Sequence, residues 1–331
     1  MQHRATIAEV ARRAGVSPTT VSHALSGRRH VAPATRRCIE QAARDLRYRP
    51  NAVARSLRTR RSLTASLIIP DISNPFYPRL ARGLQDTLAA AGYHTLVCNT
   101  DRIAANELEY VVDVVNRQVD GVVVVAFHLT TDDLREVPLA DVPFVSVGPR
   151  LDHAAIDVVS SGDASGARDA TRHLLTRGHT VGMIGGPAGL PPSEIRAEGY
   201  RQALAEAGVE LRSDWIATGD FTHEGGVIAA RELLEQADRP SAIFCANDLM
   251  AIGAMSVARE LRLRIPEDIA LVGYDDIDAA ALVSPGLTTV LNPADEVGVT
   301  AGRLLLERMQ GYEGPRRNLA VKHPLVVRQS S

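Results

Sequence analysis

The sequence contains little lysine, cysteine or aromatic side chain, and the first two scarcities exclude classes of site. Lys322 is the one lysine among 331 residues, and no glycine pattern precedes it, which excludes a Gly-x-x-x-x-Gly-Lys phosphate loop. The cysteines Cys38, Cys98 and Cys245 are odd in number and widely spaced. We therefore expect small buried thiols in a reducing compartment, and neither a disulfide framework nor a metal-binding set.

Long apolar segments are also missing. The longest strongly apolar run, residues 122–127, is far shorter than the roughly 20 residues that a membrane-spanning helix needs. Glu9 interrupts the amino-terminal stretch, where a secretory signal would be continuously apolar. These absences predict a cytoplasmic protein without a membrane partner.

Charged residues are present in ordinary number but are divided unevenly along the chain. The whole chain carries 37 basic and 39 acidic residues, a net charge of −2, whereas residues 1–61 carry 14 arginines and 3 carboxylates, a net charge of +11. The remaining 270 residues therefore carry a net charge of −13. Such an asymmetry predicts a polyanionic partner for the amino-terminal segment alone.

The basic segment begins with the signals of a helix and a turn. Thr6 and Glu9 are spaced as a capping box, in which each side chain binds a backbone amide at the start of a helix. This first helix is predicted to run to about Arg13. Gly15 follows it and can adopt the left-handed conformation that ends a helix.

A second helix is predicted over residues 18–25, capped by Ser17 and with Pro18 at its first position. Its outer face is expected to carry Thr19, Thr20, Ser22 and His23, and its inner face Val21, Ala24 and Leu25. Two short helices joined by a glycine turn are typical of a helix-turn-helix that enters the major groove of DNA. A third helix, 33–46, is predicted to close this small core with Cys38 on its inner face. Periodicity alone leaves a solvated basic bundle as an alternative.

Residues 50–61 form a basic linker after the third helix. Asn51 is a candidate cap and residues 52–57 have helical propensity, but so short a helix is marginal in water. We expect it to order only when something packs against it.

Specific positions in both segments follow a known order. They are Thr6-Ile7, Val10-Ala11, Ala14-Gly15-Val16-Ser17, Thr20-Val21-Ser22, Leu25, Tyr48-Arg49-Pro50-Asn51-Ala52 and Ala54-Arg55-Ser56-Leu57. This order resembles the lactose/galactose repressor family of bacterial transcription regulators. The resemblance implies a helix-turn-helix head at 1–49, a hinge helix at 50–61, and an effector-binding and dimerisation core at 62–331.

The resemblance also implies which residues contact DNA. They are Thr6, Ser17, Thr19, Thr20, Ser22, His23, Arg28, Asn51, Ala54, Arg55, Leu57 and Arg58. Thr19, Thr20 and His23 are the expected readers of base edges. Leu57 is expected to wedge between base pairs in the minor groove, where contacts with the bent duplex must offset the lost stacking. Packing of Leu57 on the core, as an ordinary linker residue, is the alternative.

Two positions depart from the family pattern. Ala32 stands where the family usually has a serine cap, a loss of about 1 kcal/mol. Arg47 replaces the usual glycine after the third helix, at a position expected to adopt the left-handed conformation.

The acidic body alternates short β-branched runs with helical stretches. Buried parallel strands are predicted at 67–69, 95–97, 122–125 and 143–147, with helices at 74–91 and 106–117. A second series of strands begins at 158–159 and continues at 181–184, 216–217, 242–245 and 269–272. The likeness of residues 85–92 to 201–208 supports a duplication. The sequence thus predicts an α/β core of two lobes with a ligand site in the crevice between them.

The resemblance implies that this core is similar to periplasmic sugar-binding proteins, with parallel sheets flanked by helices. In that fold the chain crosses between the lobes three times, here near Gly162, Asn292 and Val321. One lobe would hold about 62–161 and 293–321, and the other about 162–292 and 322–331.

Ligand-binding candidates are polar and aromatic side chains that follow strands or open helices. They are Phe76, Tyr77, Arg196, Phe221, Asn247 and Asp275. Carboxylate, amide and guanidinium groups suit vicinal hydroxyls, and an aromatic face can cover a sugar or base ring. Asp248 and Asp276 fit a helix cap or turn equally well. Gly162-Asp163 stands where the family usually shows Asp-Asn, so we expect no ligand contact at Gly162, and Asp163 is left as an alternative contact.

Two rival classes are weaker. An enzyme is disfavoured because Gly182-x-x-Gly185-Gly186 is no dinucleotide fingerprint and because His173 and His179 lack metal-ligand spacing. An exported binding protein of the same fold would have a signal peptide and no head. The sequence therefore predicts a homodimeric repressor without cofactor, metal or catalytic residue, which binds double-stranded operator DNA. Its effector would be a sugar or sugar derivative, with a nucleobase or nucleoside as the alternative.

Overall fold

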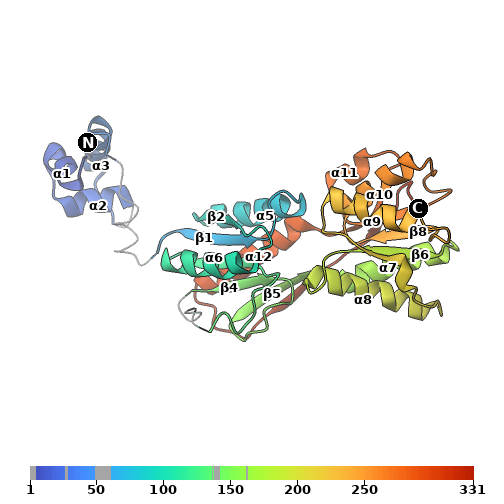
Figure 1. Cartoon of the computed structure of the whole chain (residues 1–331). Helices are drawn as coiled ribbons and strands as arrows, with labels where there is room; N and C mark the ends of the chain where they lie inside the picture. The colour runs from blue at the N-terminus through green and yellow to red at the C-terminus, as the bar shows by residue number, and fades with distance from the viewer. Residues whose placement is uncertain (1–4, 27–28, 49–60, 136, 138–141, 162) are drawn as a thin grey trace. The chain divides into compact units, whose positions relative to one another are not determined.

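The computed structural model describes residues 5–26, 29–48, 61–135, 137, 142–161 and 163–331. The chain divides into two compact units, Met1–Ser62 and Leu63–Ser331 (Figure 1). The first unit is helical, and the second contains two parallel sheets flanked by helices. The predicted fold class is therefore confirmed.

The amino-terminal unit contains α1 (Ile7–Ala14), α2 (Pro18–Ser26) and α3 (Pro33–Asp45). The capping box is present at Thr6, and Gly15 closes α1 in the left-handed conformation with φ 68°. The Ser17 hydroxyl accepts a hydrogen bond of 3.1 Å from the Thr20 amide at the start of α2. The three helices enclose a small core of Val10, Ala11, Val21, Ala24, Ile39 and Ala42.

Two inward predictions in this unit are wrong. Leu25 and Cys38 are both exposed. Because successive residues of a helix differ by about 100° in direction, the stripe that buries Ile39 and Ala42 leaves Cys38 outside it. Leu25 lies near the end of α2 and is not part of the small core.

The two departures from the family pattern lie at the ends of α3, and Arg47 has the predicted conformation. Ala32 is the N-cap residue of α3, and its side chain makes no capping hydrogen bond. Arg47 is left-handed with φ 49°. An arginine therefore occupies a backbone conformation that glycine adopts without strain.

The first sheet of the core has the strand order β11-β5-β4-β3-β1-β2, and all its strands are parallel. Its strands are β1 (Thr64–Ile69), β2 (His94–Asn99), β3 (Gly121–Val125), β4 (Phe144–Val147), β5 (Ile156–Ser161) and β11 (Asn318–Val321). The helices of this lobe are α5 (Phe76–Ala90), α6 (Ala104–Asn116) and α12 (Ala294–Met309).

The second sheet has the order β12-β10-β9-β8-β6-β7. Its strands are β6 (Val181–Gly185), β7 (Ile216–Thr218), β8 (Ala242–Cys245), β9 (Ala270–Asp275), β10 (Thr288–Leu291) and the antiparallel β12 (Leu325–Val326). The helices are α7 (Asp163–Thr176), α8 (Pro191–Glu206), the 3₁₀ turn η1 (Ser213–Trp215), α9 (His223–Leu234), α10 (Asp248–Glu260) and α11 (Asp278–Leu282).

The chain passes between the two sheets after β5, between β10 and α12, and between β11 and β12. The strand at 158–159, which the sequence places first in the second series, pairs with β4 and belongs to the first sheet. The strand at 95–97 is not buried as predicted, since Leu96 and Val97 are 39% and 38% exposed. It forms β2, which lies at the edge of its sheet and pairs with β1 alone.

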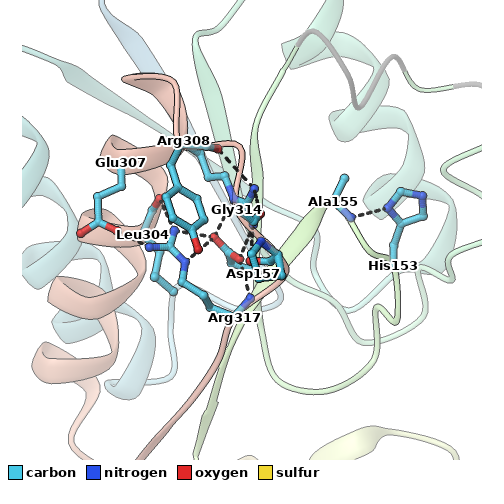
Figure 2. Close-up of polar contacts among 10 residues, drawn as sticks. His153, Ala155, Asp157, Leu304, Glu307, Arg308, Gly314 and Arg317 are labelled. Atoms are coloured by element: carbon cyan, nitrogen blue, oxygen red, sulfur yellow. Dashed lines mark hydrogen bonds and ion pairs between the residues drawn. The ribbon is translucent and has the colours of Figure 1, made fainter.

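The buried carboxylate of Asp157 connects three segments that lie next to these crossings. Asp157 of β5 accepts hydrogen bonds from Arg308 of α12 at 2.8 and 2.9 Å and from Arg317, beside β11, at 2.7 to 3.2 Å. Figure 2 shows the two guanidinium groups converging on this one side chain. Burial by itself raises the pKa of Asp157, but the arginine hydrogen bonds outweigh burial and lower the pKa to about 2.

Candidate functional site

A cavity lies between the two lobes of the core, at the carboxyl ends of their strands. Its empty space, including the opening to solvent, is about 770 Å³. The first lobe contributes Pro70, Asp71, Asn74, Phe76, Tyr77, Arg102, Val125, Ala126, Phe127, Val147, Gly148 and Pro149, and the second contributes Pro191, Pro192, Ile195, Arg196, Phe221, Asp275 and Asn292. The carboxyl edge of parallel sheets is where ligand sites form in α/β folds.

Three polar side chains of the second lobe form one connected group in this cavity. The Arg196 guanidinium lies 3.4 Å from the Asp275 carboxylate and 3.8 Å above the ring of Tyr274. It also donates to the carbonyl oxygen of Ala246. The Asn292 amide donates to the same Asp275 oxygen at 3.0 Å. The group holds Asp275 and Arg196 in fixed directions at the cavity wall.

Asn292 was predicted as a crossing point and not as a ligand residue. It is 4% exposed, and its side-chain oxygen has no hydrogen-bond partner among the described residues. A buried acceptor without a donor is unfavourable by about 1–3 kcal/mol, so this oxygen is suited to a donor on a ligand. Its place directly after β10, beside the end of β9, is the signal that could have found it.

Three aromatic residues that the sequence predicts as ligand contacts, Phe76, Tyr77 and Phe221, also line this cavity. Phe76 and Tyr77 meet edge to face with 5.2 Å between ring centroids. Phe221 adopts φ 67°. The amide of Asn247 donates to the Phe221 carbonyl at 2.9 Å and accepts from the Met250 amide at 3.0 Å.

Asn247 is not among the residues that line the cavity, and its contact with a ligand stays a prediction. It caps α10 and holds Phe221 in place, which uses both ends of its amide. Asp248 and Asp276 are likewise outside the cavity lining. Asp248 accepts from the Ile277 amide at 2.8 Å and the Thr289 hydroxyl at 2.5 Å, and burial raises its pKa well above the usual range. Asp276 pairs with Arg328 at 2.7 Å.

The first lobe contributes a loop that the sequence did not reveal. Glu107 of α6 is fully buried and accepts hydrogen bonds from three successive backbone amides, those of Phe127, His128 and Leu129, at 2.7 to 3.2 Å. This contact fixes the turn after β3 and places the Phe127 side chain in the cavity wall.

The predicted DNA-contacting residues that the structure describes lie on α2 or at the starts of α1 and α2. Thr6 and Ser17 serve as caps, Thr19 is exposed, and Thr20, Ser22 and His23 are half-buried. The Thr20 hydroxyl is 2.9 Å from that of Ser17. Arg28, Asn51, Ala54, Arg55, Leu57 and Arg58 lie outside the described residues, as do residues 50–60 of the predicted hinge and Gly162.

Comparison with known proteins identifies the family to which this architecture belongs. The "HTH-type transcriptional repressor PurR" of Vibrio vulnificus (strain CMCP6) is 38% identical over 331 residues, which cover 98% of each chain. The chain belongs to the LacI family. Residues 6–51 match "Bacterial regulatory proteins, lacI family", and residues 171–331 match "Periplasmic binding protein-like domain".

Solved structures of LacI-family relatives agree with the assignment. The Lac repressor dimer bound to operator and the anti-inducer ONPF has a TM-score of 0.89 and 25% identity, and the match covers 99% of each chain. The complex of the transcriptional regulator CelR with cellobiose has a TM-score of 0.74 and 33% identity, covering 99% of this chain and 100% of that one. The chain is a DNA-binding transcriptional regulator and not an enzyme.

Three further predictions of this LacI-family chain concern metal binding, membrane crossing and two histidines. Among the described residues, no three His, Cys, Asp or Glu side chains are grouped to hold a metal ion. In the same part of the chain no helix combines the length and apolarity needed to cross a membrane. His173 and His179 bind the hydroxyls of Ser331 and Ser241, and burial, followed by the charge of Arg177, lowers their pKa.

Proposed function

We propose that this regulator represses transcription as a cytoplasmic homodimer whose operator affinity is set by a small effector bound between the lobes. One observation carries the proposal. The cavity brings together a carboxylate, a guanidinium and a buried amide oxygen without a partner among the described residues, in a chain whose other unit is a helix-turn-helix. The relation to the Lac repressor dimer and its operator complex supports the homodimer and the DNA partner.

A sugar or sugar derivative is the first candidate effector. The polar group of Arg196, Asp275 and Asn292 offers both donors and acceptors for neighbouring hydroxyls. Phe76 and Phe221 supply apolar faces for the ring. The cellobiose complex of CelR supports this class.

A nucleobase or nucleoside is the second candidate, and the first-lobe wall favours it. Apart from Asp71, Asn74 and Arg102, that wall is mainly apolar. A flat heterocycle with one polar edge would place that edge against the second lobe and its faces against the aromatic side chains. The likeness to PurR supports this candidate.

On DNA, each head would read one half of a near-palindromic operator. Thr19, Thr20 and His23 are proposed to contact base edges, and Leu57 to wedge between the central base pairs of the minor groove. An apolar wedge adds affinity only if the bent duplex gains contacts elsewhere. Leu57→Ala should therefore weaken operator binding strongly while the dimer stays intact.

The test begins by selecting operators from a random duplex library with the full chain. Affinity for the selected duplex is then measured by gel shift with cellobiose, ribose, guanine and hypoxanthine in turn. At least one compound should change the affinity, and Asp275→Asn should remove that response while preserving DNA binding by the free protein. Selection of no duplex, or a response that survives Asp275→Asn, contradicts the proposal.

A further inference from the structure

Arg102 of the first lobe lines the cavity and reaches the second lobe. It follows β2, and its guanidinium donates a hydrogen bond to the carbonyl oxygen of Asp220 in the second lobe. The same guanidinium is 3.9 Å from the Asp71 carboxylate of its own lobe. Its side chain is 30% exposed, so it lies at the boundary between the cavity and solvent.

The first-lobe end of this contact is held firmly. The Arg102 amide donates to the Pro70 carbonyl at 3.0 Å, and the Arg102 carbonyl oxygen lies 3.1 Å from His128 Nε2. Asp101 and Arg102 both adopt left-handed conformations, with φ 53° and 61°. Such conformations persist in non-glycine residues where surrounding contacts hold them, and they concentrate at functional sites.

The second-lobe end is equally fixed. The Asp220 carboxylate accepts hydrogen bonds from the Thr222 amide at 2.9 Å and the Thr222 hydroxyl at 2.6 Å. Phe221, the next residue, is left-handed, lines the cavity, and is held by Asn247. A ligand that packs on Phe221 therefore also stabilises the carbonyl that Arg102 binds.

A second pair between the lobes is weaker. Arg79 of α5 is 3.8 Å from Asp278 of α11, and the Asp278 side chain is 92% exposed. Exposed ion pairs at this distance contribute little. A charged donor bound to a fixed carbonyl at the edge of a cavity contributes more, because both groups are directed before they meet.

We propose that Arg102 is a positioning residue that holds the two lobes closed over the cavity. Its bond to the Asp220 carbonyl forms when the lobes come together and breaks when they separate. This proposal depends on the proposed function only in the identity of the small molecule that the closed cavity would hold. Closure itself is measurable without effector or DNA.

The experiment measures the distance between the lobes in the full chain by pulsed electron paramagnetic resonance. Spin labels are attached at Gln85→Cys on α5 and Ala205→Cys on α8, both exposed, in a background with Cys38→Ser and Cys98→Ala. Cys245 is buried and stays unlabelled. Dilution with unlabelled chains restricts the signal to pairs within one chain.

Arg102→Met keeps the apolar stem and removes the guanidinium, and Arg102→Lys keeps the charge. We expect the ratio of closed to open molecules to fall about tenfold in Arg102→Met and less in Arg102→Lys. Arg82→Met is the matched control, since Arg82 is an exposed arginine whose ion pair with Asp86 stays on the same helix. It should leave the distances unchanged.

Identical distance distributions in the wild-type protein and Arg102→Met would overturn the inference, as would a wild-type chain without a closed population. If Arg102→Met does not fold, as judged by circular dichroism, Arg102→Lys decides in the same way. Operator binding measured in parallel separates the two proposals. If Arg102→Met loses the closed population but keeps effector-responsive DNA binding, the result bears on Arg102 alone. If the wild-type chain closes normally but binds no DNA, the result bears on the proposed function alone.

Discussion

At the scale of single residues, a position after a strand predicts nearness to the site but not the direction of the side chain. Phe76, Phe221, Arg196 and Asp275 meet in one cavity as the sequence predicts. Asn247 satisfies the same rule, yet its side chain caps α10 and is absent from the cavity lining. The partners of a side chain are decided by tertiary packing, which a single sequence does not display.

Sequence reasoning missed Glu107 and Arg102 for another reason, which is that their partners lie far away along the chain. Glu107 binds amides about 20 residues further along the chain, and Arg102 binds a carbonyl in the other lobe. Neither residue belongs to a local motif. A carboxylate in the middle of a helix and an arginine in a loop are ordinary surface residues until the fold is known.

Glu107→Gln should destabilise the core. Glutamine keeps one acceptor oxygen, but its amide nitrogen would face backbone amides that now donate hydrogen bonds to the Glu107 carboxylate. Loss of charged hydrogen bonds in a buried position predicts a decrease of about 2–3 kcal/mol in the free energy of unfolding. Urea denaturation measures it, with Glu109→Gln as the control, because Glu109 is exposed on the same helix. Equal stabilities of the two variants would contradict the role of Glu107.

Asn292→Leu should weaken effector binding. Leucine has the same branching but lacks both the buried oxygen that is without a partner among the described residues and the amide group that donates to Asp275. We expect about a tenfold increase in Kd for the compound that changes operator affinity, corresponding to one lost hydrogen bond. Isothermal titration calorimetry measures this change, and an unaltered Kd would show that the oxygen faces no ligand donor.

At the scale of helices and strands, local signals worked where local energies decide. The capping box, the glycine turn and the Ser17 cap predicted α1 and α2 because each satisfies its own backbone groups within a few residues. The strand at 95–97 was misjudged for the opposite reason. An apolar β-branched run identifies a strand, but whether that strand lies at the centre or the edge of its sheet depends on the order of all the strands.

Substitutions at the two ends of α3 should stabilise this helix. Ala32 already has extended backbone angles, φ −50° and ψ 135°, so Ala32→Ser can supply a cap of about 1 kcal/mol. Arg47→Gly should relieve the left-handed arginine by a similar amount, about 1 kcal/mol. Hydrogen exchange of the α3 amides measures both effects. Ala34→Ser, inside the first turn, is the control and should not increase protection.

The contact of Asp157 with Arg308 and Arg317 should make stability depend on pH in the acid range. A folded pKa of about 2, below the ordinary 3.8, means that the contribution is complete above about pH 4 and is lost as pH falls toward 2. The difference corresponds to about 2 kcal/mol. Asp157→Asn leaves two arginines without their carboxylate, so the variant should be less stable at neutral pH by about 3–5 kcal/mol.

Urea unfolding at pH 5 and at pH 2.5 tests this expectation. The gap in stability between the wild-type protein and Asp157→Asn should narrow by about 1.5 kcal/mol at the lower pH. Asp152→Asn provides the control, because Asp152 pairs with Arg316 but its side chain is 85% exposed. An equal narrowing in both variants would mean that the buried carboxylate is not responsible.

At the scale of the whole molecule, the net charge of −2 conceals two opposite charges, +11 on residues 1–61 and −13 on the remainder. Composition predicted this division, and the structure assigns the basic residues to a separate helical unit that ends at Ser62. The body should therefore be repelled by DNA phosphates. Contacts with the duplex are then confined to the head and linker, and only arginines of that region should release counterions on binding.

The salt dependence of operator binding tests this confinement. Arg37 is exposed on α3, and Arg37→Gln should reduce the slope of log K against log salt concentration by about 0.9, the value for one phosphate contact on duplex DNA. Arg82→Gln, which changes an exposed arginine of the body, should leave the slope unaltered. Fluorescence anisotropy over a series of KCl concentrations gives both slopes. A lower slope in Arg82→Gln would place part of the body on the DNA, and an unchanged slope in Arg37→Gln would remove α3 from the phosphate contacts.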